Sequence, residues 1–231
     1  MRKIAIITAR GGSKRIPRKN IKEFCGKPIL AYSIEAALSS GCFDTVMVST
    51  DDGQIAQVAK QYGAQVPFFR SEETSNDYAA TADVILEVLS EYQKRAESYD
   101  LVCCIYPTAP FLTGERLRQA MSLLEDGEAD SVLPVVRFSF PPQRSVVIKD
   151  GFLQPMWPEC MPMRSQDLEP FYHDAGQFYC LRTESFLKQK KLIMDKTVPL
   201  ELSELEVQDI DTLQDFRLAE VKFRMRNGEE A

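Results

Sequence analysis

The amino-acid sequence predicts an α/β fold built on a mainly parallel β-sheet. Short apolar runs rich in Ile and Val alternate along the chain with longer segments whose apolar residues recur at helical spacing. The short runs are apolar at successive positions, as in strands that helices cover on both faces. With 231 residues, 44% of them hydrophobic, the chain can bury a sizeable core. We therefore expect residues 1–231 to form a single domain.

The first third of the chain indicates strands and helices in alternation. Residues 4–8 and 45–49 are apolar and β-branched, which predicts two buried strands. Residues 28–39 place their apolar side chains on one helical face, and a second helix over 55–62 is expected to stop at the glycine that follows it. The run 66–69 predicts a further strand, which its proline restricts to an edge or an end. Parallel strands joined in this way imply right-handed crossovers.

The middle of the chain continues this pattern. An apolar stripe at helical spacing predicts a helix over 79–92, and an apolar run predicts a strand over 101–106. The strand is followed by a proline-containing loop at the sheet edge where open α/β sheets bind ligands. A helix is expected over 114–124 and a strand over 131–136.

Residues 138–170 interrupt the alternation. They contain six of the thirteen prolines and the only tryptophan, together with several methionines and phenylalanines. A weak hairpin is expected between 146–148 and 152–153. The segment could be a flap that packs on its own domain. We favour a subunit contact, because these side chains would otherwise form an exposed apolar patch.

The last quarter of the chain returns to the sheet. The aromatic segment 171–179 is expected to include a strand that enters a pocket, and a short helix is expected over 184–189. A further strand is expected over 197–200, and a final helix over 213–226.

A basic loop with two glycines follows the first strand. Gly11 and Gly12 allow the backbone to approach a ligand closely and to direct N–H groups at it. In a chain of net charge −6, five cationic residues lie within ten positions, namely Arg10, Lys14, Arg15, Arg18 and Lys19. Basic loops are often simply solvated, but a polyphosphate at the carboxyl end of a strand would neutralise this one. The loop matches neither the dinucleotide-binding fingerprint nor the Walker spacing.

Two aspartates near the C-terminus are candidate metal ligands. Asp209 and Asp211 alternate on an extended segment, so both carboxylates are expected on the same side. Mg²⁺ binds one or two carboxylates together with substrate phosphates, and would suit the pair. The alternative is that Asp211 caps the following helix, since Asp211 and Gln214 have capping-box spacing.

Composition excludes several classes of protein. The chain has no apolar run of membrane-spanning length and no cleavable signal pattern, so a cytoplasmic protein without membrane contact is expected. The six cysteines contain no C-x-x-C pair and the only histidine is His173, so buried free thiols are expected rather than a zinc site. Cys103 and Cys104 should lie on opposite faces of one strand. A negative net charge argues against nucleic-acid binding.

Several motifs in order carry a resemblance to a known family. ARGGSKRIPRKN, VSTDD, YPTAPF, YHDAGQFY and DIDT follow one another as in the CMP-sugar-acid synthetases, the CMP-sialic acid synthetase group. The resemblance covers almost the whole chain. It implies a Rossmann-like nucleotidyltransferase fold and a Mg²⁺-dependent reaction in which CTP and a nonulosonic acid give the CMP-sugar and pyrophosphate. It also implies that residues 138–170 form a dimerisation element that reaches the active site of a partner subunit.

The resemblance extends to individual residues of the nucleotide site. Arg10, Lys19 and Asp211 are the expected catalytic residues, and Asp209 and Asp211 the expected metal ligands. The expected nucleotide-binding residues are Arg10, Gly11, Gly12, Ser13, Lys14, Lys19, Asn20, Arg70 and Thr81. A catalytically silent nucleotide-binding module is the alternative from a different class, and the intact aspartate pair argues against it.

The sugar site departs from the sialic acid enzymes. The chain has Tyr106 where those enzymes commonly carry glutamine, and His173 and Asp174 near the position of an asparagine. With Gln177, these residues are the expected sugar contacts, or else they support the pocket from behind. The segments IPRKNIKEFCGKP and YHDAGQFY are most similar to members that act on pseudaminic acid, which is the expected substrate. Sialic, legionaminic and 3-deoxyoctulosonic acids are the alternatives.

Overall fold

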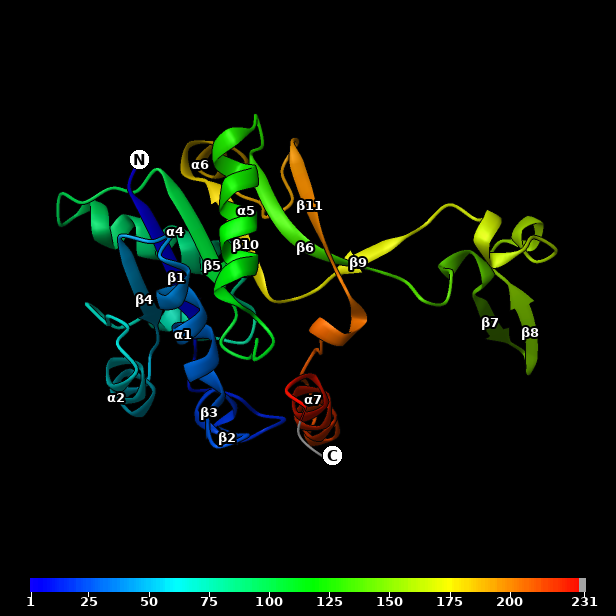
Figure 1. The fold of residues 1–231 in the computed structure, drawn as a ribbon, viewed down its shortest axis with the longest axis horizontal. Helices are drawn as coiled ribbons and strands as arrows, with labels where there is room; N and C mark the ends of the chain where they lie inside the picture. The colour runs from blue at the N-terminus through cyan, green and yellow to red at the C-terminus, as the bar shows by residue number, and fades with distance from the viewer. Residues whose placement is uncertain (229–231) are drawn as a thin grey trace.

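The structure, a computed structural model, describes residues 1–228. Its central sheet has seven strands in the order β11-β6-β10-β5-β1-β4, with β9 paired to β6 (Figure 1). The strands are β1 (Lys3–Thr8), β4 (Thr45–Ser49), β5 (Leu101–Ile105), β6 (Ser131–Arg137), β9 (Tyr172–Asp174), β10 (Phe178–Arg182) and β11 (Thr197–Leu202). β1 is parallel to β4 and β5, and β6 to β11, whereas β9 and β10 are antiparallel to their neighbours. The predicted α/β fold with a mainly parallel sheet is confirmed.

Helices cover both faces of this sheet. The α-helices of the described residues are α1 (Ile29–Ser40), α2 (Gly53–Gln61), α3 (Glu72–Ser75), α4 (Thr81–Gln93), α5 (Gly114–Asp126), α6 (Thr183–Gln189) and α7 (Leu213–Arg226), of which α7 packs apart from the sheet. Short 3₁₀ helices are η1 (Lys19–Ile21), η2 (Pro142–Arg144), η3 (Pro158–Cys160), η4 (Ser165–Asp167) and η5 (Glu204–Glu206). None of the helices within residues 1–228 has the length and apolar character needed to cross a bilayer.

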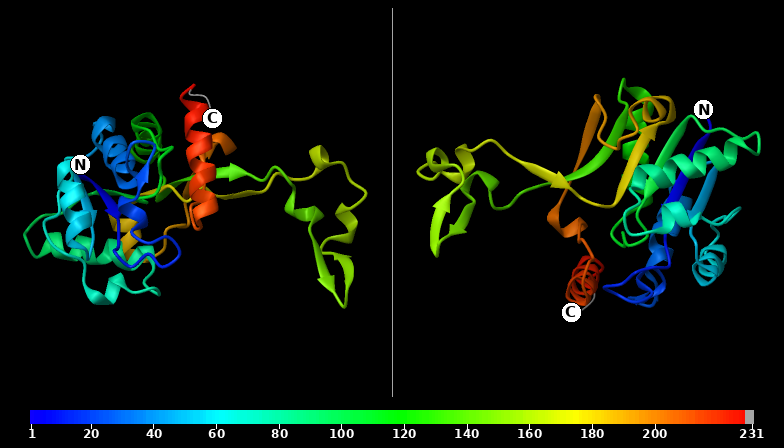
Figure 2. Two further views of the ribbon diagram at one scale, coloured as in Figure 1. Left: turned by 90° about the horizontal axis from the view of Figure 1, so that it is seen from below. Right: turned by 180° about the vertical axis from the view of Figure 1, so that it is seen from behind.

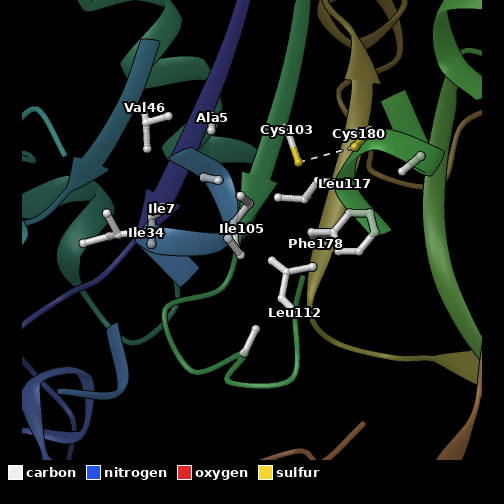
Figure 3. Close-up of a cluster of buried hydrophobic side chains, with 14 of the residues drawn as sticks. Ala5, Ile7, Ile34, Val46, Cys103, Ile105, Leu112, Leu117, Phe178 and Cys180 are labelled. Atoms are coloured by element: carbon white, nitrogen blue, oxygen red, sulfur yellow. Dashed lines mark hydrogen bonds between the residues drawn. The ribbon is translucent and has the colours of Figure 1, made fainter. Parts of the chain in front are cut away.

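The alternation of side chains along the strands divides the core into two layers. Ala5 and Ile7 of β1 pack with α1, α2 and α5 on one face, whereas Ile4 and Ile6 pack with α4 and α6 on the other. Figure 3 shows part of the first layer, in which Cys103 and Cys180 lie side by side between β5 and β10. Cys104 belongs to the opposite layer, so the predicted division of the two adjacent cysteines is confirmed.

The strand predicted over 66–69 is wrong. Where the chain passes the edge of β4, the N–H of Gln65 donates to Val46 O and Gln65 O accepts from the N–H of Val48, both at 2.9 Å. This contact is a single bridge between Gln65 and Met47. Pro67 comes two residues later and has no N–H to donate, so the pairing does not continue.

A separate apolar cluster joins the first loop to the last helix. The loop after β1 leads into a small hairpin of β2 (Glu23–Phe24) and β3 (Lys27–Pro28). Ile16 and Phe24 from this region pack with Ile210, Phe216 and Ala219 in and before α7. The cluster brings the segment that contains Asp209 and Asp211 to the side of the basic loop, although about 190 residues separate them in sequence.

Residues 138–170, here called the arm, project away from the sheet. Figures 1 and 2 show the arm as an extension whose far end carries the hairpin of β7 (Val146–Lys149) and β8 (Phe152–Pro155). Asp150 and Gly151 have φ of 52° and 83°, the backbone that an Asp-Gly hairpin turn requires. The side chains of Phe140, Ile148 and Phe152 are 87%, 76% and 74% exposed.

Candidate active site

The glycine turn after β1 is held by the loop that follows β4. The Gly11 N–H donates to Oδ1 of Asp51 at 2.7 Å, so this N–H is used within the protein. A Cβ atom at position 11 would come within 3.0 Å of the Asp52 side chain, which explains the requirement for glycine there. The VSTDD motif therefore supports the shape of the turn.

Arg18 anchors the loop. Its Nη1 and Nη2 donate to the Asp52 carboxylate at 2.5 and 3.1 Å. The same carboxylate caps α2 by accepting from the N–H groups of Gln54 and Ile55 at 2.9 Å. The hydrogen bond from Arg18 lowers the pKa of Asp52 from 3.8 to about 2. Arg18, one of the five cationic residues of the loop, is therefore held by an ion pair within the protein.

Lys19 connects the basic loop to the C-terminal segment. Its Nζ donates to the backbone carbonyl of Ile210 at 2.6 Å, between the two predicted metal ligands in sequence. Burial lowers the pKa of Lys19, and the nearby carboxylates of Asp211 and Asp209 oppose this shift. The ammonium group therefore lies within the electrostatic reach of both aspartates.

A cavity of about 440 Å³, here called the basic cavity, lies between the loop and Asp211. It is lined by Thr8, Arg10, Ser13, Lys14, Arg15, Lys19, Asn20, Asp77, Tyr106, Pro107, Thr108 and Asp211. Four cationic side chains here face two carboxylates, so the cavity carries a positive balance suited to an anionic ligand. Asn20 fixes the loop, because its Nδ2 donates to the Arg10 carbonyl at 2.8 Å.

Ion pairs hold three of these cations. Arg10 and Lys14 donate to the two carboxylate oxygens of Asp77 at 2.7 and 2.5 Å. Arg15 pairs with Oδ2 of Asp211 at 2.7 Å. Asp77 and Asp211 thus pair with three of the four cationic side chains of the basic cavity.

Arg70 and Thr81 line a smaller cavity of about 170 Å³, here called the side cavity. It shares Thr8, Arg10 and Asp77 with the basic cavity. The buried Arg70 guanidinium donates from Nε and Nη2 to the Oγ and carbonyl of Ser49 at 3.0 and 2.7 Å. Burial lowers the pKa of Arg70. The Thr81 hydroxyl lies 3.1 Å from the Tyr106 hydroxyl.

A third cavity of about 580 Å³, here called the acidic cavity, adjoins the basic cavity at Tyr106. It is lined by Tyr106, Val136, His173, Asp174, Ala175, Gly176, Glu204, Val207, Gln208, Asp209 and Lys222. Three carboxylates face one lysine here, so its charge balance is opposite to that of the basic cavity. Tyr106 lies at the junction, and its ring packs edge-on against Tyr179 at 5.5 Å.

The residues predicted to contact the sugar separate into two groups. His173 and Asp174 border the acidic cavity on β9. Asp174 is held in place by the Gly176 N–H at 2.7 Å and the Tyr179 hydroxyl at 2.5 Å. Gln177 is buried, and its Nε2 donates to the Glu206 carbonyl at 2.5 Å. Its amide therefore stabilises the wall behind the cavity.

The capping alternative for Asp211 is wrong. The N-cap of α7 is Thr212, whose Oγ1 accepts from the N–H of Asp215 at 3.2 Å, while the Asp215 carboxylate accepts from the Thr212 N–H at 2.7 Å. These hydrogen bonds from Thr212 lower the pKa of Asp215. The Asp211 carboxylate is free of this role and borders the basic cavity.

The aspartate pair fits a magnesium ion only together with a phosphate ligand. The prediction that both carboxylates lie on the same side is wrong, because Asp211 borders the basic cavity and Asp209 the adjoining acidic cavity. The Lys19 contact lies between them in sequence, at the Ile210 carbonyl. Within residues 1–228, no three His, Cys, Asp or Glu side chains are grouped to hold a metal ion. Mg²⁺ commonly takes one or two carboxylates and completes its shell with water and substrate phosphates, so the donor set is suitable.

Sequence reasoning missed several residues of these cavities. Asp77 pairs with two of the predicted cations, and Lys222 is the one lysine of the acidic cavity within the part of the chain that the structure describes. Asp77 lies in a polar, turn-rich segment that gave no specific signal. Lys222 reaches its cavity from the middle of α7, which the linear sequence could not indicate.

Known proteins that are similar in sequence to this chain are cytidylyltransferases and a CMP-sugar synthase. A model of the family described as cytidylyltransferase matches residues 4–148. The chain is 40% identical over 228 residues to a pseudaminic acid cytidylyltransferase of Campylobacter jejuni, with 98% of both chains covered. It is 36% identical to a CMP-N,N'-diacetyllegionaminic acid synthase of Legionella pneumophila, with 95% of both covered.

A solved structure supports the architecture. The structure of CMP:2-keto-3-deoxy-manno-octonic acid synthetase complexed with CTP matches 99% of this chain and 100% of its own, with a TM-score of 0.69 and 18% identity. At this identity the likeness concerns the fold, and it confirms the Rossmann-like nucleotidyltransferase architecture. Because the family model covers more than half of the chain and the similar sequences match it almost from end to end, this protein belongs to the cytidylyltransferase family.

Proposed function

We propose that this protein transfers CMP from CTP to a nonulosonic acid with release of pyrophosphate, and that the acid is pseudaminic acid. The pseudaminic acid cytidylyltransferase of Campylobacter jejuni is 40% identical over 98% of the chain, which supports the choice of acceptor. The observation that carries the proposal is the meeting of a cationic and an acidic cavity at Tyr106, with Asp211 and Asp209 on either side of their boundary.

The basic cavity suits the triphosphate of CTP. Arg10, Lys14 and Lys19 converge on it from the loop after β1, at the carboxyl edge of the sheet. These residues, with Ser13 and Asn20, form the proposed triphosphate site. The side cavity extends from Arg10 to Arg70 and Thr81, which supports a role for these two in binding the nucleoside.

The proposed reaction is an in-line displacement at the α-phosphorus. The anomeric hydroxyl of the acid attacks from the side of the acidic cavity, and a bond forms between its oxygen and the α-phosphorus. The bond between the α-phosphorus and the oxygen that bridges it to the β-phosphorus breaks, the electron pair stays on that oxygen, and pyrophosphate leaves toward the basic cavity. The proton of the attacking hydroxyl passes to solvent water. Arg10 and Lys19 stabilise the charge that develops on the phosphates, since such catalysis consists mainly of positioning and electrostatic stabilisation.

Asp211 and Asp209 would hold Mg²⁺ in this proposal. When bound, the ion would supply positive charge at the phosphates. The Lys19 ammonium lies within reach of both carboxylates and bonds to the Ile210 carbonyl between them, which keeps the segment beside the triphosphate site. Arg15 pairs with Oδ2 of Asp211 at 2.7 Å, and both side chains border the basic cavity.

The acidic cavity is the proposed acceptor site. Tyr106, His173 and Asp174 border it and offer hydroxyl, imidazole and carboxylate groups to a sugar that carries hydroxyl and acylamino groups. Asp174 is fixed by two hydrogen bonds, so its direction is set before the ligand binds. Gln177 supports this site from behind through its bond to Glu206.

A pyrophosphate-release assay tests the proposed function. The protein is supplied with CTP, Mg²⁺ and, in separate reactions, pseudaminic, legionaminic, N-acetylneuraminic and 3-deoxyoctulosonic acids. We expect the highest kcat/KM with pseudaminic acid. A preference for another acid would replace the acceptor and keep the reaction. CTP binding without pyrophosphate release from any acid would contradict the proposal and identify a non-catalytic nucleotide-binding module.

We further propose a homodimer formed through the arm. Exposed apolar side chains along the arm, such as Phe140, Ile148 and Phe152, support this assembly because burying them against a second copy would remove them from water. A cytoplasmic location is also proposed. It is supported by Cys103 and Cys180, which remain thiols although their sulfur atoms lie 3.3 Å apart.

A further inference from the structure

Asp77 binds two of the cations that the proposed function assigns to the triphosphate. Its Oδ1 accepts from Arg10 at 2.7 Å and its Oδ2 accepts from Lys14 at 2.5 Å. Each carboxylate oxygen thus accepts a hydrogen bond from one cation, as two oxygens of a bound phosphate group would. The hydrogen bonds from Lys14 and Arg10 lower the pKa of Asp77.

Asp77 also lies at the boundary of two cavities. With Arg10 and Thr8, it borders both the basic cavity and the side cavity. A nucleotide that occupied both would have to cross the Arg10–Asp77 ion pair. The side cavity holds about 170 Å³, whereas ordinary ligand pockets hold roughly 300–1,000 Å³. Five of its nine lining residues come from residues 74–81, so movement of this segment would enlarge it.

The segment that carries Asp77 is lightly attached. At its start, Ser71 is tied to α4, because its N–H donates to Oε1 of Glu87 at 2.8 Å. Farther along, the N–H groups of Tyr78 and Ala79 donate only to the nearby Asn76 side chain. Across the described residues, the hydrogen bonds and ion pairs that join 76–79 to distant parts of the chain all come from Asp77. Tyr78 is 96% exposed.

We propose that Asp77 is a displaceable counter-anion. Before the nucleotide binds, Asp77 holds Arg10 and Lys14 in position. The triphosphate then replaces its carboxylate and releases residues 76–79 from the side cavity. A triphosphate carries several negative charges against the single charge of Asp77, so it both competes for the two cations and repels the carboxylate. The inference rests on the proposed function, because it takes the basic cavity as the triphosphate site.

Hydrogen–deuterium exchange of the full-length protein tests the displacement. Amide exchange of the peptide that covers residues 71–80 is followed with and without inorganic tripolyphosphate, which carries the phosphate chain but neither base nor sugar. We expect the exchange of residues 76–79 to rise at least about threefold when tripolyphosphate binds, because their attachment through Asp77 is lost. Unchanged or slower exchange at saturating tripolyphosphate would overturn the proposal.

Two variants make the test specific. Asp77→Asn should show fast exchange of 76–79 without any ligand and no further rise with tripolyphosphate. Its KM for CTP should fall at least about threefold, because the competing charge is gone. Glu72→Gln removes the same charge from an exposed position of the same segment and should behave like the wild type. A raised KM or a collapse of kcat in Asp77→Asn would instead assign Asp77 to ligand or metal binding and contradict displacement.

This test can fail independently of the proposed function. The exchange experiment uses no acceptor acid and no turnover, so it reports only on the segment and the phosphate chain. If pyrophosphate is released normally while tripolyphosphate leaves the exchange of 76–79 unchanged, the displacement is wrong and the function stands. If tripolyphosphate accelerates exchange but no acid yields pyrophosphate, the function is wrong and the displacement stands.

Discussion

At the scale of single residues, neighbouring carboxylates before and in α7 have different tasks. Asp215 and Thr212 form a capping box and satisfy the free N–H groups at the start of the helix. Asp211 comes one residue before the cap, pairs with Arg15 and borders the basic cavity. The capping motif is shifted by one residue from the spacing that the sequence suggested, and this shift leaves the Asp211 carboxylate available for chemistry.

The Asp211→Asn variant tests this division. We expect kcat to fall at least about 100-fold, because an amide would be a poorer ligand than a carboxylate for the proposed Mg²⁺, whose positive charge would stabilise the phosphates. Stability should change by less than about 1 kcal/mol, since the pair with Arg15 is solvent-exposed. Pyrophosphate release and thermal unfolding measure the two effects. Full activity with a lower Tm would show that Asp211 has a structural role only.

Thr212→Ala is the matched control. Loss of the N-cap hydroxyl should lower the free energy of unfolding by about 1 kcal/mol. Its kcat should stay within about twofold of the wild type, because Thr212 borders none of the three cavities within the described chain. A kcat loss as large as that of Asp211→Asn would mean that the helix start, rather than the carboxylate, controls activity.

The Arg18–Asp52 pair should make stability depend on acid pH. The folded-state pKa of Asp52 is depressed from 3.8 to about 2, so its contribution is present above pH 4 and is lost as the pH falls toward 2. Asp52→Asn should therefore reduce the free energy of unfolding by at most about 2 kcal/mol at pH 7, and by clearly less at pH 3. Urea unfolding at the two pH values measures the difference. An equal loss at both would contradict the linkage.

At the scale of elements, the position of α7 decides whether the site exists. Phe216 is 2% exposed and packs edge-on against Phe24 at 5.5 Å, which ties the helix to the small hairpin that follows the basic loop. Ile210, in the same cluster, lies between the two aspartates in sequence. Apolar packing therefore sets the distance between the basic loop and the acidic segment.

Phe216→Ala should loosen the contact between the basic loop and the segment that contains Asp209 and Asp211. We expect a loss of about 3–5 kcal/mol in the free energy of unfolding, because a large buried ring is removed. The KM for CTP should also rise, since Ile210 and its neighbouring aspartates lose their support. Leu213→Ala, on the same helix at a 49% exposed position, should change neither quantity appreciably. Equal effects in both variants would contradict the role given to the cluster.

At the scale of the whole molecule, the arm is the largest departure from a compact shape (Figures 1 and 2). Its hairpin exposes Ile148 and Phe152 on neighbouring strands. Neighbouring apolar side chains are seldom exposed together on a monomeric protein, so we expect a second copy of the chain to cover them in solution. The proposed dimer explains both the projection and its composition.

Sedimentation velocity tests the dimer. The wild type should sediment as a dimer at micromolar concentration. The double variant Ile148→Lys, Phe152→Lys should sediment as a monomer, because two charges replace apolar contact area. Lys149→Glu, which changes the charge at an exposed position of the same hairpin without removing an apolar side chain, is the control and should remain a dimer. A wild-type monomer at all concentrations would remove the arm from the assembly.

Much of this architecture could be predicted from local patterns. The β-branched runs 4–8 and 45–49 and the stripe on α4 carry their own periodicity. The strand predicted over 66–69 failed because its pairing depends on a neighbouring edge and on Pro67 rather than on composition. The basic loop from Arg10 to Lys19 could be predicted as a binding site because its residues are contiguous in sequence. The positions of Asp77 and Lys222 could not be predicted, because these residues reach their cavities only through tertiary packing.

The central claim is that the basic loop and the C-terminal aspartate act on one triphosphate. A double-mutant cycle of Lys19→Met and Asp211→Asn, read as kcat/KM for CTP in the pyrophosphate-release assay, tests it most directly. If the two residues act as one unit, the double variant should lose little more than the worse single variant. Losses that multiply would show that the two residues act independently and would contradict the account.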